Sequence, residues 1–308
     1  MKPDVSVVIV TYNRATKLRN LLQALHDQRM ENIEVIVVID GSTDATREML
    51  VEFQQQSSFL RFVYHQNQGR SVSRNLGARL ATAELIIFFD DDMLPLPNCL
   101  DQHFDHHQKQ PNTICVGTQE EDPSRVKNDF DLFRYVRSLH WVRNIETSEH
   151  IIPVSQVFLS AANFSISKEL FEKLGGFDRK KEVVEDFDLA VRAVRRGILI
   201  FYRPSARAFH DNILTCSEFV KKQRQYAESY LRYSAVQPEL EQSFSALQRY
   251  RPSFLKRLFY FVFSTPFFVR LVDSNVLQVL PRRLRFEFYA VVVTGMAKVL
   301  PSRIKNLA

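Results

Sequence analysis

The chain has 308 residues, of which 45% are hydrophobic and 25% are charged. This composition is that of a globular protein with a substantial core, and it excludes an intrinsically disordered chain. The three cysteines lie far apart without a CxxC pair, which argues against a disulfide framework and favours a reducing compartment.

The net charge of +6 is unevenly distributed. Residues 216–308 contain 15 Lys and Arg against 6 Asp and Glu, a net +9, whereas residues 1–215 contain 26 against 29, a net −3. This contrast predicts a catalytic or binding domain over 1–215 and a basic segment over 216–308. Such a segment suits an anionic membrane surface. Because the chain carries no nucleic-acid-binding motif, we expect no nucleic-acid partner.

The apolar runs of the chain are too short to cross a bilayer. No signal peptide surrounds Val5–Val10. The most apolar later stretch, Leu258–Val269, is about half the ~20 residues that a spanning helix needs. We therefore expect a cytoplasmic protein, held peripherally at the inner face of the cell membrane by its basic segment.

The first part of the chain alternates between apolar runs and amphipathic segments. Four short, β-prone runs predict buried strands at Val5–Val10, Ile33–Ile39, Leu60–Tyr64 and Leu85–Phe89. Apolar residues at helical spacing predict helices between them, at Leu18–Leu25, Met49–Phe53 and Ser71–Thr82. Ser42 or Thr43 is expected to cap the second helix. The order predicts an α/β domain with a mostly parallel sheet and helices on both faces.

Later elements are less regular. The polar stretch Glu120–Pro153 is expected to shape an acceptor pocket or to be a plain surface excursion. Further elements are predicted as strands at Thr113–Thr118 and Ile198–Tyr202, an ordered segment at Val157–Ser167, a short helix ending at Gly175-Gly176, and a helix over about Phe187–Arg196. Gly197 suits the left-handed cap of that last helix.

Beyond Cys216 the pattern is helical. Aromatic-rich runs such as Phe254–Phe263 are interleaved with Lys256 and Arg257, and basic residues also precede the run Phe286–Val293. Basic residues beside short aromatic helices suit a helix that lies in the membrane interface. The alternative is a helical cap packed on the sheet, and both can hold at once.

Three consecutive aspartates, Asp90, Asp91 and Asp92, directly follow the fourth predicted strand. Carboxylates at the carboxyl end of such a strand open into the crevice where α/β sheets bind ligands. Adjacent negative charges cost free energy unless a cation offsets them, and hard divalent ions bind carboxylates while bridging phosphate oxygens. The triplet therefore predicts a metal–nucleotide site, with a solvated acidic turn as the alternative.

Six motifs in chain order resemble those of family 2 glycosyltransferases. They are Val5–Arg14, Asp40–Thr46, Asn67–Ala83, Asp90–Asp92, Gly175–Asp178 and Glu185-Asp186. The resemblance covers about Val5 to His210. It implies a Rossmann-like GT-A fold and an inverting, nucleotide-sugar-dependent transfer assisted by Mn²⁺ or Mg²⁺.

The resemblance also implies a role for each matching residue. Asp186 is the expected base, and Glu185 is expected to position donor or acceptor. The expected metal site comprises Asp92 as the direct ligand, Asp90, which contacts the ion through water or contacts the ribose, and His210, which supplies a further metal or diphosphate contact. The nucleotide contacts are Thr11, Tyr12, Asn13, Arg14, Asp40, Arg74, Asp90 and Asp91.

Some of these roles also follow from the residues themselves. A carboxylate such as Asp40, at a strand end, can accept a hydrogen bond from an imide N–H of the kind that uracil carries, so a UDP-sugar is the favoured donor. Arg74 lies near a helix start, where backbone amides and a guanidinium together bind anions. Asp91, the middle residue of the triplet, has a solvated side chain as its alternative. Asp44 is expected to be a carboxylate that favours a helix start.

One histidine-rich segment imitates a metal site. His103, His106 and His107 alternate with acidic residues, but Phe104 stands where an HExxH motif requires Glu. We expect a solvated helix face there.

Together these patterns predict a glycosyltransferase that acts on a glycan or lipid-linked acceptor in the synthesis of cell-envelope polysaccharide or glycoconjugates. One alternative is a non-catalytic membrane-binding protein on an inactive fold. Another is a sugar nucleotidyltransferase, although the Gly-rich loop of that class is missing from Thr11–Arg14.

Overall fold

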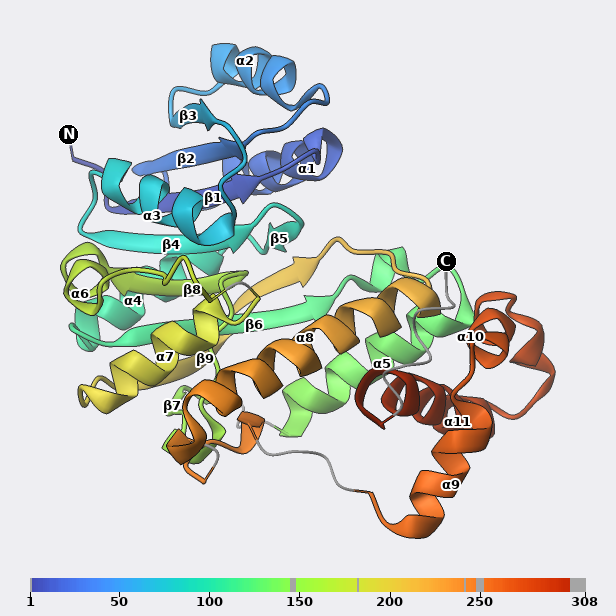
Figure 1. The fold of residues 1–308 in the computed structure, drawn as a ribbon. Helices are drawn as coiled ribbons and strands as arrows, with labels where there is room; N and C mark the ends of the chain where they lie inside the picture. The colour runs from blue at the N-terminus through green and yellow to red at the C-terminus, as the bar shows by residue number, and fades with distance from the viewer. Residues whose placement is uncertain (1, 145–147, 182, 241, 248–251, 300–308) are drawn as a thin grey trace. The chain divides into compact units, whose positions relative to one another are not determined.

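The computed structural model describes residues 2–144, 148–181, 183–240, 242–247 and 252–299 (Figure 1). The chain divides into two compact units. The first comprises Met1–Glu120 with Val142–Asp211, and the second comprises Glu121–Trp141 with Asn212–Ala308.

The first unit is built on a mixed sheet with the strand order β3-β2-β1-β4-β8-β6-β9-β5, and β7 pairs with β9. The strands are β1 (Val5–Thr11), β2 (Ile33–Asp40), β3 (Leu60–His65), β4 (Leu85–Asp90), β5 (Met93–Pro95), β6 (Ile114–Glu121), β7 (His150–Ile151), β8 (Asn163–Ser167) and β9 (Ile200–His210). Strands β1 to β4 are parallel, whereas β8 runs antiparallel to both β4 and β6. The α/β fold with a largely parallel core is thus confirmed.

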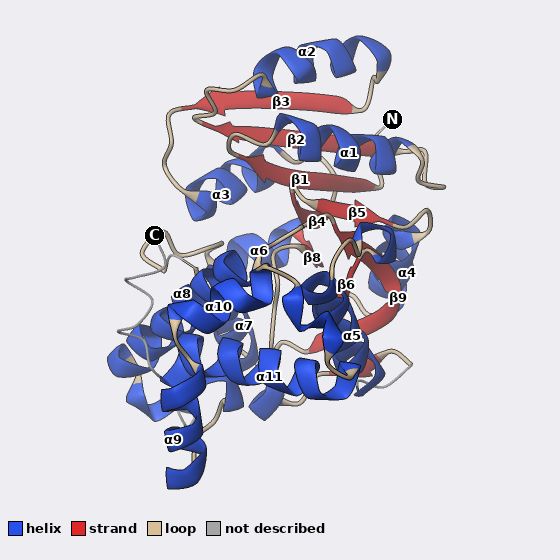
Figure 2. Cartoon of the chain, turned by 90° about the vertical axis from the view of Figure 1, so that its right-hand side faces the viewer, coloured by secondary structure: helices blue, strands red, loops and turns tan. Residues whose placement is uncertain are grey.

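The register of the parallel strands aligns their carboxyl ends (Figure 2). Thr11 pairs with Ile39, Val10 pairs with Asp90, and Asp40 pairs with His65. Because parallel strands end at one edge of the sheet, this register brings the polar strand ends together in a single row.

Helices cover both faces of this sheet. They are α1 (Ala15–His26), α2 (Thr46–Gln56), α3 (Arg70–Leu80), α4 (Cys99–Lys109), α6 (Lys168–Leu174) and α7 (Glu185–Arg195). The leucines of α1 pack with Val7 and other odd-numbered residues of β1. Helix α3 lies against the opposite face, where a Cβ on Gly77 would meet Val8 Cγ1 at 2.4 Å. Alternate strand residues point to opposite faces, so both helix layers are buried on the same strand.

The second unit is helical, as predicted for residues beyond Cys216. Its helices are α5 (Asp129–Asn144), α8 (Cys216–Val236), α9 (Phe254–Phe263), α10 (Pro266–Asp273) and α11 (Arg282–Thr294). Phe130 and Phe133 of α5 and Tyr289 of α11 share one core. The Tyr289 hydroxyl donates to Asp129 at 2.7 Å. Among the helices that the structure describes, none combines the length and apolar character needed to cross a bilayer.

Three sequence-based expectations were wrong. The alternative of a plain surface excursion over Glu120–Pro153 was wrong, because the stretch contains the 16-residue helix α5, whose Phe130 and Phe133 are buried in the core of the helical unit. Strand β9 continues through Pro204 to His210 rather than ending at Tyr202. Neither Ser42 nor Thr43 caps α2, because Asp44 accepts the hydrogen bond from the Thr46 amide at 3.2 Å.

Candidate active site

Two loops at the carboxyl ends of β1 and β2 are joined through Asn13. Its side-chain oxygen accepts hydrogen bonds from the amides of Thr43 at 2.7 Å and Asp44 at 3.3 Å. The backbone amide of Asn13 donates to Ser42 Oγ at 2.9 Å. Asn13 has a φ of 53°, a left-handed conformation that asparagine tolerates well. Asn13 therefore holds the loops after β1 and β2 together, and the neighbouring Tyr12 is half exposed.

Asp40 holds the loop that leads into α3. Its two carboxylate oxygens accept hydrogen bonds from the amides of Gln68 at 2.8 Å and Gly69 at 3.1 Å. His65 Nδ1 lies 3.6 Å from the same carboxylate. A carboxylate offers about four acceptor positions, so Asp40 can still accept the N–H of a nucleotide base.

Asp91 is buried rather than solvated, so the alternative of a solvated side chain was wrong. It accepts a hydrogen bond from Thr11 Oγ1 at 2.8 Å and one from Arg14 Nη1 at 3.0 Å. Burial raises the pKa of Asp91 to about 6, an effect that Arg14 opposes and Asp92 reinforces. Asp91 thus connects the loop that follows β1 to the end of β4.

Asp92 and His210 form the part of the site that fits a metal ion. Pairing of Met93 with His210 places the imidazole Nε2 3.7 Å from Asp92 Oδ1. Arg14 Nη1 lies 2.7 Å from the other oxygen of Asp92. Over the described part of the chain, no three His, Cys, Asp or Glu side chains are grouped to bind a metal by themselves. Two protein ligands completed by water and diphosphate oxygens suit Mg²⁺ or Mn²⁺.

Arg74 connects the aspartate triplet to the start of α7. Its guanidinium is buried, with Nη2 2.6 Å from Asp90 Oδ1 and Nη1 2.7 Å from Glu185 Oε1. It also stacks over Phe177 at 5.5 Å from the ring centre. Burial by itself would raise the pKa of Asp90, but the charge of Arg74 lowers it to about 2. Arg74 therefore orients two protein carboxylates.

Glu185 and Asp186 begin α7. Glu185 is buried, and its Oε2 accepts no hydrogen bond from any described residue. Asp186 accepts hydrogen bonds from the amides of Phe187 at 2.7 Å and Ala161 at 3.4 Å. Burial raises the pKa of Asp186 to about 7, the neighbouring Glu185 adds to the rise, and Arg74 opposes it. A carboxyl group with this pKa is suited to accept a proton near neutral pH.

The histidines of α4 do not form the solvated face that was expected. His103 and His106 are fully buried. The ring of His103 is hydrogen-bonded to Ser165 Oγ at 2.9 Å and Asn163 Oδ1 at 2.8 Å, and burial lowers its pKa to about 4. These polar partners on β8, far away in sequence, form hydrogen bonds with both ring nitrogens. The imidazole can therefore be buried without losing its hydrogen bonds.

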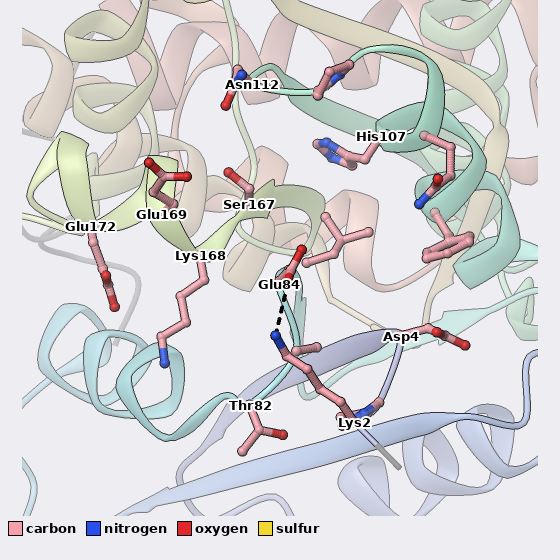
Figure 3. A pocket seen from close by; sticks show the side chains of 16 residues that line it. Lys2, Asp4, Thr82, Glu84, His107, Asn112, Ser167, Lys168, Glu169 and Glu172 are labelled. Carbon is pink, nitrogen blue, oxygen red and sulfur yellow. Dashed lines mark hydrogen bonds and ion pairs between the residues drawn. The ribbon is translucent and has the colours of Figure 1, made fainter.

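A cavity lies at the other end of the sheet (Figure 3). Its volume is about 990 Å³, and its lining includes Lys2, Glu84 and Lys168. Lys2 pairs with Glu84 at 3.0 Å, and Lys168 donates to the Ala81 carbonyl at 2.7 Å. The length of β1, about 20 Å for seven residues, separates it from the aspartate triplet. This cavity is therefore not part of the site around the aspartate triplet.

Solved structures of other proteins have a similar fold. A mannosyltransferase from Pyrobaculum calidifontis, in complex with GDP-Man and Mn²⁺, superposes with a TM-score of 0.63 at 18% identity, covering 98% of this chain and 88% of that one. The S. aureus protein TarS, residues 1–349 with UDP, superposes with a TM-score of 0.56 at 17% identity, covering 97% and 90%. The fold is thus the GT-A fold of glycosyltransferases.

Sequence comparison identifies the family. The model of glycosyl transferase family 2 matches residues 6–175, and the chain belongs to this family. The putative glycosyltransferase EpsH of Bacillus subtilis is 38% identical over 90 residues, which are 29% of this chain and 26% of that protein. An uncharacterized glycosyltransferase of Haemophilus influenzae is 27% identical over 199 residues, 64% of each chain. The matches thus span less than two thirds of the length of these two curated relatives.

Proposed function

We propose that the protein transfers a sugar from a nucleoside diphosphate sugar, with a UDP-sugar as the favoured donor, to a hydroxyl group of a glycan or lipid-linked acceptor. The transfer inverts the anomeric centre and serves the synthesis of cell-envelope polysaccharide or glycoconjugates. The observation that carries the proposal is that Arg74 connects the aspartate triplet to Glu185, and that the adjacent Asp186 is a half-buried carboxyl group with a pKa near 7.

Asp186 is the proposed base. Inversion requires one group to remove the proton of the acceptor hydroxyl while the nucleotide leaves from the opposite face of the sugar. Asp186 can hold that proton because burial and the adjacent Glu185 raise its pKa. Glu185 Oε2, which accepts no hydrogen bond from the residues that the structure describes, would accept one from a hydroxyl of donor or acceptor and so orient it.

Asp92 and His210 would hold the metal ion, and Asp90 would contact it through water or contact the ribose. When bound, Mn²⁺ or Mg²⁺ neutralises charge on the diphosphate leaving group. Arg14, which contacts both Asp91 and Asp92, would add a positive charge beside the metal and the diphosphate. Asp40 would accept the imide N–H of uracil, and Tyr12 and Asn13 would border the base.

Thermal shift with UDP, GDP, CDP and dTDP, each with Mn²⁺ or EDTA, tests this proposal. A nucleotide at a hundred times its dissociation constant adds about 2.7 kcal/mol to the free energy of unfolding. We expect a metal-dependent shift with UDP. A shift with GDP would change the donor class, and no shift with any nucleotide would favour the non-catalytic alternative.

Two variants separate the proposed roles. Asp92→Ala should abolish the metal-dependent part of the shift. Asp186→Asn should leave the shift intact and abolish transfer, because an amide cannot accept the proton. Equal loss of binding and transfer in Asp186→Asn would contradict its role as the base.

We also propose that residues 216–308 hold the enzyme peripherally at the inner face of the cell membrane. There the site would meet an acceptor anchored in, or growing at, that surface. The net charge of +9 on this segment supports the proposal.

A further inference from the structure

Helix α9 exposes an unusually apolar surface. Six of its ten residues are large, apolar and exposed by 49% to 80%, namely Phe254, Leu255, Leu258, Phe259, Phe261 and Val262. Scattered apolar residues are common on protein surfaces, but a contiguous patch of this kind marks an interaction site. In both views α9 stands at an outer edge of the helical unit (Figures 1 and 2).

The inner side of α9 is firmly packed. Tyr260 is buried, and the ring of Phe263 lies 5.4 Å from that of Phe268 and 5.8 Å from that of Phe288. A Cβ on Gly295 would collide with Ser264 Oγ at 1.7 Å, which shows how closely the end of α9 approaches the segment after α11. The apolar face of α9 is therefore presented by a helix whose other side is packed within the helical unit.

The order of residues around the helix is that of an interfacial helix. At 100° per residue, the six exposed apolar side chains fill an arc of about 160°. Arg257 lies about 40° beyond one border of this arc and Lys256 about 60° beyond the other, and both are exposed. The buried Tyr260 falls between these two basic residues on the far side, whereas Phe263 lies about 40° beyond Phe259, between the apolar arc and Lys256. A basic side chain thus lies beyond each border of the apolar arc.

This geometry selects one kind of partner. A helix of ten residues is about 15 Å long, half the thickness of a bilayer core, so it can lie in a membrane but cannot cross one. Flanking Lys and Arg extend toward lipid headgroups while the aromatic and leucine side chains enter the acyl layer. A second protein surface would need an apolar groove but would have no general reason to meet cations at both borders.

We infer that the exposed face of α9 docks on an anionic phospholipid membrane, with the helix parallel to the bilayer and its apolar arc inserted. This deepens the proposed membrane attachment and names the helix that performs it. It rests on the proposed function only in the choice of membrane as the site of work, since lipid binding needs no nucleotide.

Vesicle flotation of the full chain tests the inference. We expect binding to vesicles of phosphatidylcholine with 30% phosphatidylglycerol, and at least fivefold weaker binding to pure phosphatidylcholine, because each basic residue near an anionic surface strengthens binding about fivefold. The double variant Leu258→Asp/Phe261→Asp should bind at least tenfold more weakly. Both side chains are more than half exposed, so the fold should survive.

The matched control is Val51→Asp/Leu199→Asp, which places the same two negative charges on apolar positions that are 45% and 46% exposed and lie outside α9. It should float like the parent. Undiminished binding by the α9 double variant would overturn the inference. So would a concentration-dependent dimer, measured by light scattering, that the double variant abolishes, because a second copy of the chain would then cover α9. The nucleotide-induced thermal shift, measured on the same samples, separates this failure from failure of the proposed transferase function.

Discussion

The buried guanidinium of Arg74 offers the sharpest test of how the site is held together. The substitution Arg74→Met keeps the length and apolar stem of the side chain but removes the charge. Glu185 is 5% exposed, and it would then be buried without its cation. Asp90 is affected less, since about a third of its side chain is exposed and water can solvate it.

Removing one partner of a buried ion pair costs about 3–5 kcal/mol, because the remaining charge is uncompensated. We expect Arg74→Met to lower the free energy of unfolding by about this amount, and most of the loss should come from Glu185. Neutralising that carboxylate as well should therefore recover stability. The free energy of unfolding of the double variant Arg74→Met/Glu185→Gln should be about 1–3 kcal/mol higher than that of the single variant Arg74→Met, within the usual range of coupling between contacting residues.

Urea unfolding followed by circular dichroism at pH 8, where carboxylates are ionised, measures these values. Arg79→Met is the matched control, because Arg79 lies on the exposed side of the same helix, and its substitution should change stability by less than about 0.5 kcal/mol. If Arg74→Met unfolds like the control, or if the second substitution restores nothing, the ion pairs of Arg74 do not organise the site.

Three further predictions concern pH and packing. The rate of transfer should rise with pH up to about pH 7 and fall about tenfold per unit below it, because Asp186, whose pKa is raised to about 7, accepts a proton only when ionised. A pH profile with no such limb would contradict this role. The contribution of His103 to stability should decline by up to about 1.4 kcal/mol per pH unit between pH 6.5 and 4, because burial lowers the pKa of His103 from 6.5 to about 4 and the unfolded chain binds the proton more readily. This contribution is fully present above pH 6.5, so the thermal unfolding temperature of His103→Asn should rise relative to that of the parent as the pH falls from 6.5 to 4. Gly77→Ala should destabilise the protein by about 1–3 kcal/mol in urea, because its Cβ would meet Val8 at 2.4 Å. A Gly77→Ala variant as stable as the parent would contradict this close packing of α3 on β1.

The local pattern of the sequence was enough to predict the strands of the parallel core. Runs such as Ile33–Ile39 are apolar, β-branched and short, and each ends at a polar residue, so the alternation of strands and helices can be predicted without tertiary information. The same pattern placed Asp40 and Asp90 at strand ends. Since parallel strands end at a common edge, their convergence followed from the predicted fold class.

The partners of these residues were decided only by the tertiary structure. Arg74 contacts Glu185, 111 positions away, and Phe130 and Phe133 of α5 are buried against a helix more than 150 positions away. His103 was expected to be solvated and is fully enclosed, because Ser165 and Asn163 of β8 satisfy its ring. Periodicity and spacing report neighbours within a few residues along the chain. Burial, ion pairing and the pKa values that follow from them depend on segments brought together by folding.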